Sequence, residues 1–230
     1  MRTNPEVKRS CLKCHAAECA EIVLQAELEA VKRLDSGRIS RFYQRGEVLY
    51  RQGETLPGLF CISSAQVKLV AVSQLGKVHI VGLAGPGQLL GLSLMISGQK
   101  APHSAIIMKS GVVCNYQAAC VKAALGEGPN LNLNVLRALA RDQSSAEERL
   151  LSLGGLSASA RISKNLLELA QPNGQVLALT RTELAQMANT STETVSRLLH
   201  SLARGGSLKL KGRQVTLLRP ADLEAIVAAG

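Results

Sequence analysis

The segment Thr180-Arg-Thr-Glu-Leu-Ala-Gln-Met-Ala-Asn-Thr-Ser-Thr-Glu-Thr-Val-Ser-Arg197 decides the fold of the C-terminal part of the chain. Thr180 and Glu183 have the spacing of a capping box, in which a hydroxyl and a carboxylate satisfy free amides at a helix start. Asn189 suits the tight turn that follows, because asparagine tolerates left-handed backbone angles better than most residues. With a second helix over residues 192–203, the segment predicts a helix-turn-helix.

A β-hairpin is predicted directly after the second helix. The glycine pair at 205–206 stops that helix, and residues 208–217 read as two strands around a Lys-Gly-Arg turn. Such a hairpin is a wing. Its Lys209, Lys211 and Arg213 can meet phosphates, although basic residues in a turn are as often only solvated.

The second helix presents side chains that suit the edges of DNA bases. Thr192 lies in its first turn, and Glu193, Ser196 and Arg197 share one face because residues three and four apart project together. Arginine can donate to guanine, glutamate can accept from cytosine, and serine serves a base or a phosphate. The alternative is an ordinary surface helix. The order of cap, turn, helix and wing favours double-stranded DNA as the partner. The residues expected to face the core are Val195, Leu198 and Leu199.

Composition is compatible with a nucleic-acid partner. The 230 residues suffice for two compact domains, and 27 Lys and Arg against 17 Asp and Glu give a net charge of +10. That charge suits phosphates, although membranes are anionic too. Without a long apolar run or a signal peptide, the chain is expected to be cytoplasmic, with no membrane partner.

The N-terminal half predicts a helix followed by a small β-domain. Residues 20–34 carry apolar side chains near the period of a short helix. From Arg41 to Tyr116 the chain changes to short apolar and β-branched runs divided by glycines, which is typical of an antiparallel barrel or β-roll.

A long helix is predicted between these two parts, from Leu131 to about Leu153 and opened by Pro129. Its apolar stripe has the spacing of a two-stranded coiled coil, which predicts a parallel homodimer. The alternative is that the stripe packs on its own barrel. Gly154 and Gly155 indicate a hinge. The predicted dimerisation residues are Leu136, Leu139, Gln143, Ala146, Leu150 and Leu153.

Three of the six cysteines form the pattern Cys11-x2-Cys14-x4-Cys19. In a reducing compartment, clustered thiols indicate metal or redox chemistry rather than a disulfide framework. Cys11-Leu-Lys-Cys14-His15 is formally a c-type haem attachment motif, although that chemistry belongs to exported proteins. Zinc could use the three cysteines with His15 or Cys114, and a thiol switch without metal is a further alternative.

The order of barrel, long helix and winged helix-turn-helix resembles the CRP/FNR family of bacterial transcription factors. The run Glu193-Thr-Val-Ser196-Arg197-Leu-Leu is similar to the FNR branch, whose recognition helix carries Glu-x-x-Ser-Arg. The resemblance implies that Glu193, Ser196 and Arg197 read a palindrome with TTGAT-like half-sites. It also implies a regulator rather than an enzyme, with RNA polymerase as a partner.

The resemblance implies an α+β fold. A cupin-like or cyclic-nucleotide-binding-like β-roll is expected to sense, a long helix to dimerise and a winged helix-turn-helix to bind DNA. The expected division is a cysteine-bearing segment with a short helix over 1–35, a β-roll over 36–128, a dimerisation helix over 129–154 and a DNA-binding domain over 155–230.

The residues that hold a cyclic nucleotide in this family are replaced here. Such members use Gly-Glu-Leu for the ribose and Arg-Ser or Arg-Thr for the phosphate. This chain reads Gly91-Leu92-Ser93 and Ala101-Pro102-His103-Ser104. Because the acidic acceptor and the guanidinium fork are both lost, no cyclic nucleotide is expected.

FNR proteins resemble this chain in having three clustered N-terminal cysteines and a distant fourth on a barrel strand, which together hold a [4Fe-4S] cluster. The resemblance therefore assigns Cys11, Cys14, Cys19 and Cys114 as ligands, as suits iron–sulfur chemistry. The family commonly spaces its second and third cysteines by five residues, against four here. Cys61 and Cys120 are interpreted as structural, although either could replace Cys114.

The resemblance also suggests a mechanism. An intact cluster would favour the paired helices and DNA binding, and oxygen or nitric oxide would release them. The alternatives are a cluster-free regulator, acting as a thiol redox switch or a small-ligand sensor, and an iron–sulfur or metal-dependent redox enzyme. The enzyme is disfavoured because no P-loop, dinucleotide fingerprint or catalytic triad is evident.

Overall fold

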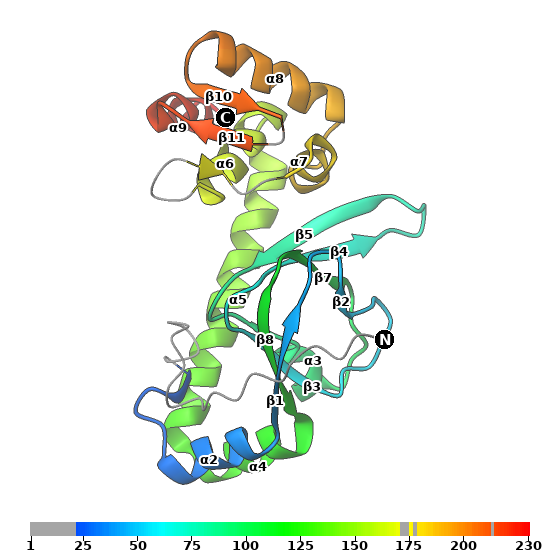
Figure 1. The fold of residues 1–230 in the computed structure, drawn as a ribbon, viewed down its shortest axis with the longest axis vertical. Coiled ribbons are helices and arrows are strands. Elements are labelled where there is room, and N and C mark those ends of the chain that lie inside the picture. Colours follow the sequence, from blue (N-terminus) through cyan, green and yellow to red (C-terminus); the bar gives the residue numbers. More distant parts are fainter. Residues whose placement is uncertain (1–21, 171–174, 177–178, 213) are drawn as a thin grey trace. The chain divides into compact units, whose positions relative to one another are not determined.

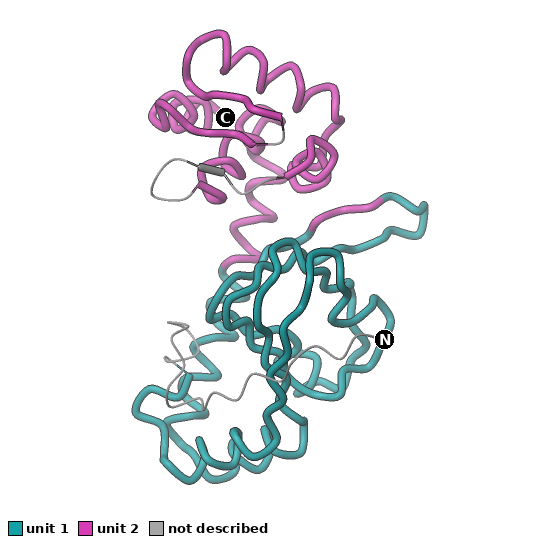
Figure 2. Tube along the Cα trace, in the orientation of Figure 1, with its two compact units in different colours: residues 1–77, 81–144 teal, residues 78–80, 145–230 magenta. Residues whose placement is uncertain are grey.

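The structure is a computed structural model that describes residues 22–170, 175–176, 179–212 and 214–230. The chain divides into two compact units, one of residues 1–77 and 81–144 and the other of residues 78–80 and 145–230 (Figure 2).

The first unit is a β-roll. Its described residues form two four-stranded sheets with the orders β1-β8-β3-β6 and β2-β7-β4-β5 (Figure 1). Strand β8 pairs antiparallel with β1 and β3, and β7 pairs antiparallel with β2 and β4. The predicted β-roll is therefore confirmed. The strands are β1 (Arg38–Tyr43), β2 (Val48–Tyr50), β3 (Gly58–Ile62), β4 (Gln66–Val72), β5 (Val78–Ala84), β6 (Leu89–Leu90), β7 (Ser104–Lys109) and β8 (Gly111–Gln117).

Strand β3 is buried on both faces, because successive side chains point to opposite sides of a strand. Phe60 and Ile62 enter the apolar interior of the roll, together with Val113 of β8. Leu59 and Cys61 belong to a second core on the other face of the sheet, together with Cys114 of β8. The sheet β1-β8-β3-β6 therefore separates two cores.

Helices supply the other side of this second core. Helix α2 (Leu28–Ser36) packs against α4 (Ala118–Glu127), and α5 (Pro129–Gly155) adds its first turns (Figure 1). The short helix α3 (Leu92–Ser97) contributes Leu92 and Met95. Helix α4 was not predicted. The other helical side chains in this core are Ala30, Val31, Leu34, Val121, Ala124, Leu131 and Val135.

The continuous helix predicted over residues 20–34 is wrong. Gln25 has a φ of 56°, in the left-handed region, and α2 begins only at Leu28. The carbonyls of Ile22 and Leu24 accept hydrogen bonds from the Asn134 side chain, at 2.9 and 3.0 Å, rather than from amides one helical turn ahead. A tertiary contact therefore overrides the helical periodicity of the sequence.

The predicted long helix is confirmed as α5 and extends through the glycine pair at 154–155. Leu131, Asn134 and Val135 are its buried residues, all within its first two turns. None of the helices in the described part of the chain is long and apolar enough to span a membrane.

The second unit contains the predicted helix-turn-helix. Helix α7 (Arg181–Ala188) begins with a complete capping box between Thr180 and Glu183, and Asn189 ends it in the left-handed conformation with a φ of 47°. Helix α8 (Thr192–Arg204) follows, capped by the Ser191 hydroxyl. The turn chemistry read from the sequence is therefore confirmed.

The wing is confirmed as β10 (Leu208–Lys211) and β11 (Gln214–Leu217), which pair antiparallel. Strand β9 (Gln175–Val176) pairs with β11 and completes a three-stranded sheet within the described residues. Helices α6 (Ala158–Glu168) and α9 (Pro220–Ala228) pack against each other. Helix α9 was not predicted.

Candidate sensor site and DNA-reading helix

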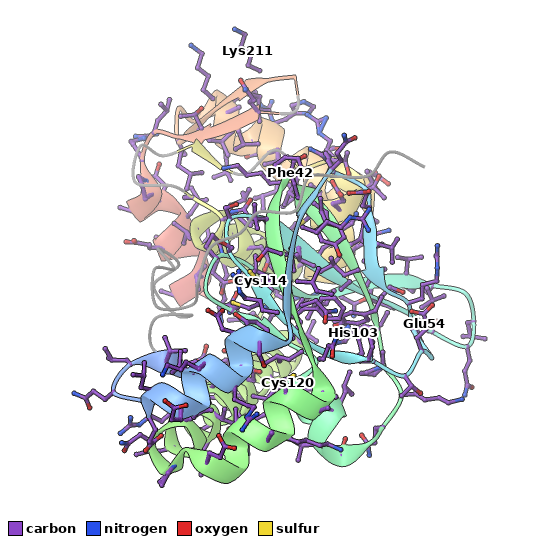
Figure 3. The ribbon with its side chains drawn as sticks, turned by 60° about the horizontal axis from the view of Figure 1, so that its bottom comes forward. Phe42, Glu54, His103, Cys114, Cys120 and Lys211 are labelled. Atoms are coloured by element: carbon purple, nitrogen blue, oxygen red, sulfur yellow. The ribbon has the colours of Figure 1, made fainter. Side chains whose placement is uncertain are left out.

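Cys114 lies in the middle of a row of side chains that crosses the sheet. Its Cα pairs with that of Ser40 on β1 and with that of Cys61 on β3. Both cysteines are buried, with Cys61 0 % and Cys114 6 % exposed. Two of the chain's cysteines are thus cross-strand neighbours on the helix-covered face of the sheet. Figure 3 shows Cys114 within the sheet and Cys120 on helix α4.

Polar groups surround the Cys114 sulfur on its β1 side. The Ser40 Oγ lies 3.3 Å from the Cys114 Sγ, and Ser40 is itself buried. The Arg38 Nη1 donates to the Ser40 Oγ and also lies 3.9 Å from the Cys114 Sγ. Asp35, at the end of α2, holds the Arg38 Nε at 2.8 Å. A chain of polar contacts therefore runs from Asp35 through Arg38 and Ser40 to the sulfur.

The first described residues of the chain are fixed to helix α5. The Asn134 Nδ2 donates to the carbonyls of Ile22 and Leu24, and its Oδ1 accepts from Arg137 at 3.2 Å. Glu27 accepts from the Asn130 amide at 3.1 Å. Hydrogen bonds with backbone amides, its own first and that of Asn130 next, lower the pKa of the Glu27 carboxyl. Residues 22–27 are therefore held on the first turns of α5.

Cys11, Cys14, Cys19 and His15 lie outside the described residues, so the structure does not test them as ligands. Across the ranges from 22 onward that the structure describes, no three His, Cys, Asp or Glu side chains gather as a metal site. Cys120 is a half-buried free thiol on α4. Its sulfur and Cβ occupy the space beside Gly37, in which a side chain would not fit.

The environment of Cys114 fits an iron–sulfur ligand in its chemistry. Thiolates are the usual ligands of such clusters, and nearby hydrogen-bond donors suit a charged sulfur. Ile22 belongs to the same core as Cys114.

The interior of the roll carries a different chemistry. The Tyr50 hydroxyl lies 3.4 Å from the His103 Nδ1, among apolar side chains. Burial raises the pKa of Tyr50 to about 12, and burial also lowers the pKa of His103. Leu92, which stands where the resemblance leads one to expect an acidic residue, is buried in the helix-facing core. The absence of a cyclic-nucleotide ligand stays a prediction.

The residues predicted to read DNA lie on one side of α8. Thr192, Glu193 and Arg197 are exposed, and Ser196 is half-buried. Val195 and Leu199 are buried as expected, whereas Leu198 is only half-buried. On the wing, Lys209 and Lys211 are exposed, and Figure 3 shows Lys211 projecting outward from its strand. Arg213 lies outside the described residues.

Most of the predicted dimerisation residues are exposed on α5. Leu136, Leu150 and Leu153 are 61, 69 and 47 % exposed, and Gln143 and Ala146 are exposed as well. Leu139 differs, because it is half-buried and packs on the helix-facing core of the first unit. Leu139 is therefore partly covered by its own chain and is less available to a partner than the other predicted dimerisation residues.

Sequence reasoning missed Asp35, Arg38, Ser40 and Asn134. Two of them left a signal in the sequence. Asn134 lies in the same helical stripe as Leu131 and Val135, and a polar residue in an apolar stripe indicates a specific partner. Ser40 lies on the buried face of strand β1. Their partners could not be read from the sequence, because each pair is more than 70 residues apart along the chain.

Two family models match the chain. The cyclic nucleotide-binding domain matches residues 40–127, and the Crp-like helix-turn-helix domain matches residues 160–226. The first covers the β-roll with α4, and the second covers the helix-turn-helix with its wing.

Curated relatives align over most of the chain. The anaerobic regulatory protein of Aggregatibacter actinomycetemcomitans is 26 % identical over 188 residues, which are 78 % of this chain and 73 % of the relative. The fumarate and nitrate reduction regulatory protein of Escherichia coli K12 is 25 % identical over 182 residues, which are 76 % of this chain and 72 % of the relative.

Solved structures share the fold. FixK2 from Bradyrhizobium japonicum has a TM-score of 0.75 at 24 % identity, covering 84 % of this chain and 98 % of that one. The c-di-GMP responsive global regulator CLP from Xanthomonas campestris has a TM-score of 0.71 at 19 % identity, covering 83 % of this chain and 99 % of that one.

Proposed function

Because the chain belongs to the CRP/FNR family of DNA-binding transcriptional regulators, we propose that it senses oxygen or redox state through a [4Fe-4S] cluster. Members of this family are transcription factors rather than enzymes. The proposed ligands are Cys11, Cys14, Cys19 and Cys114, and the proposed location is the cytoplasm.

The observation that carries the proposal is the position of Cys114. Its buried sulfur lies on the helix-facing side of the sheet, beside the Arg38 guanidinium and the Ser40 hydroxyl, in the core that also contains Ile22. The remaining cysteines of the motif precede Ile22 by a short stretch of chain. When bound, the cluster would supply an oxygen- and nitric-oxide-sensitive inorganic centre.

The hydrogen bonds of Asn134 offer a connection from the cysteine segment to α5. Residues 22–24 are tied to Asn134 of the same helix that presents Leu136 two residues further along. A change in the order of the cysteine segment would therefore act directly on α5. A switch between two dimer states needs a contact that is more favourable in one state than in the other, and these hydrogen bonds could be that contact.

A second copy of this chain is the proposed partner of the exposed α5 leucines. Full burial of one leucine stabilises by about 1.5–3 kcal/mol, so exposed Leu136, Leu150 and Leu153 favour a partner. Replacing Leu150 by Asp should weaken the dimer in analytical ultracentrifugation, because it places charge in the seam. Leu151→Asp is the matched control, since Leu151 is exposed but lies off the predicted seam.

The proposed DNA site is a palindrome with TTGAT-like half-sites, read by Glu193, Ser196 and Arg197. Thr192, Lys211 and Arg213 are proposed to assist, and RNA polymerase is the proposed partner at promoters. Replacing Arg197 by Ala should cost about 1–3 kcal/mol of specific binding and leave binding to random DNA nearly unchanged. An equal loss on both DNAs would indicate a phosphate contact instead.

The decisive experiment is purification of the full chain without air, followed by iron and sulfide analysis. The visible spectrum and the affinity for a TTGAT palindrome are then measured before and after air is admitted. We expect about four iron and four sulfide per chain, and weaker DNA binding after the colour is lost. A colourless, iron-free protein with full DNA affinity would contradict the cluster and favour a thiol switch.

A further inference from the structure

Two polar groups lie beside the Cys114 sulfur that packing alone does not explain: the Arg38 guanidinium, which donates, and the Ser40 hydroxyl, which can donate or accept. The core around it is otherwise lined by apolar residues such as Leu59, Val121 and Leu131. Placing a hydroxyl and a guanidinium in such a core is unfavourable unless they are hydrogen-bonded. Ser40 and Arg38 are nevertheless both directed to the sulfur, at 3.3 and 3.9 Å.

The arrangement of these donors is fixed by secondary structure. Ser40 is the direct cross-strand partner of Cys114, so its side chain lies on the same face of the sheet. Arg38 lies two residues earlier on β1 and therefore projects to that face as well. Asp35 holds the guanidinium through its Nε at 2.8 Å, and only 12 % of the Arg38 side chain is exposed.

A thiol is a weak hydrogen-bond partner, whereas a metal-bound sulfur carries negative charge and accepts more strongly. Hydrogen bonds to the sulfurs of an iron–sulfur cluster set its properties, and groups that support a ligand are often as important as the ligand itself. A guanidinium that donates to Cys114 and a hydroxyl that can donate to it suit the charged sulfur of a ligand better than a neutral thiol.

We propose that Arg38 and Ser40, with Arg38 held by Asp35, form a donor shell that supports Cys114 as a cluster ligand and sets how long the cluster survives in air. This inference rests on the proposed function. Arg38 and Ser40 are positioning residues, because they act through the sulfur of Cys114.

The test compares full-length variants purified without air. Ser40→Ala and Arg38→Gln each remove one donor, and Arg38→Lys restores a positive charge. Arg41→Gln is the matched control, because Arg41 lies on the same strand but is exposed and pairs with Glu47. The readouts are iron content, the iron–sulfur(Cys) stretching band in the resonance Raman spectrum, and the half-life of the visible absorbance in air.

Ser40→Ala and Arg38→Gln should move the stretching band to higher frequency, because a sulfur that loses its donors keeps more negative charge and bonds more covalently to iron. The same loss leaves the charge of the cluster less compensated, so the cluster is oxidised more readily and its half-life in air should shorten about tenfold. Arg38→Lys should recover most of it, and Arg41→Gln should match the wild type. If Arg38→Gln loses its iron while its circular dichroism is unchanged, Arg38 is required for the cluster to bind at all, which also supports the inference.

An unchanged band and half-life in both donor variants, with the cluster present, would overturn the inference and leave the proposed function intact. A wild-type chain without iron would instead reject the proposed function, and the inference with it. If Arg38→Gln fails to fold, Ser40→Ala decides, because it removes a single oxygen from the site.

Discussion

The two faces of the β1-β8-β3-β6 sheet carry different chemistry, although both are buried. The face inside the roll contributes Phe60, Ile62 and Val113 to an apolar core, with a tyrosine–histidine pair as its polar element. The face toward the helices carries two adjacent cysteines with a serine and an arginine beside them. The family model for this region is named for a cyclic nucleotide, whereas the cysteine that we propose as a cluster ligand lies on the outer face. Under the proposed function, sensing would use the outer face of this sheet rather than the interior of the roll.

The largest expected effect comes from the outer face. Cys114→Ser should reduce the iron content to background and make DNA binding indifferent to air, because a serine hydroxyl is a poor ligand for iron–sulfur clusters. Iron analysis and DNA titration under both atmospheres measure this. Cys120→Ser is the control and should keep its iron. A Cys114→Ser protein that stays brown would move the fourth ligand to another cysteine.

A smaller effect is expected where the outer core meets α5. Asn134→Ala should lower the free energy of unfolding by about 1–3 kcal/mol, because the carbonyls of Ile22 and Leu24 lose their donor. It should also weaken the response of DNA binding to air. Asn132→Ala is the matched control, since Asn132 bonds to Leu125 instead. If DNA binding by the two variants responds equally to air, the hydrogen bonds of Asn134 do not connect the cysteine segment to α5.

On the inner face, Ile62→Val should only loosen packing. Ile62 is fully buried in the roll, and removing one methylene group typically costs about 0.5–1.5 kcal/mol. Chemical denaturation measures that loss. Iron content and air sensitivity should stay at wild-type values, and a changed air response would show that the inner core takes part in sensing.

The smallest effect concerns His103. Its folded pKa lies below the ordinary value of 6.5, because burial disfavours the charged ring. The unfolded chain therefore binds a proton more readily, and stability is lost as the pH falls from above 6.5 through the folded pKa. His103→Gln should narrow the difference in melting temperature between pH 7.5 and pH 5.5. His200→Gln serves as the control, because His200 is exposed. If the His103 variant shows the same difference in melting temperature as the wild type, His103 is not the source of the pH dependence.

Local chemistry explains which parts could be predicted from the sequence. Some features depend only on residues that are close together in the chain, so the sequence predicts them: the capping box at Thr180, the left-handed Asn189 and the wing. Arg38, Ser40 and Asn134 act on partners far away in sequence, and no short-range pattern gives their contacts. The same reason explains the error at residues 20–34, where Asn134 takes carbonyls that a helix would have used.

Helix α5 has a practical consequence for exchanging parts between relatives. It runs unbroken from Pro129 to Gly155, although its residues up to 144 group with the first unit and those from 145 with the second. A hybrid protein spliced at that boundary would join two halves of α5 from different parent proteins, and the side chains along the helix would no longer match. A splice at Leu156 lies between the end of α5 and Ser157, the N-cap of α6. Such a hybrid would take the β-roll and the whole of α5 from the same parent protein, and it should still fold.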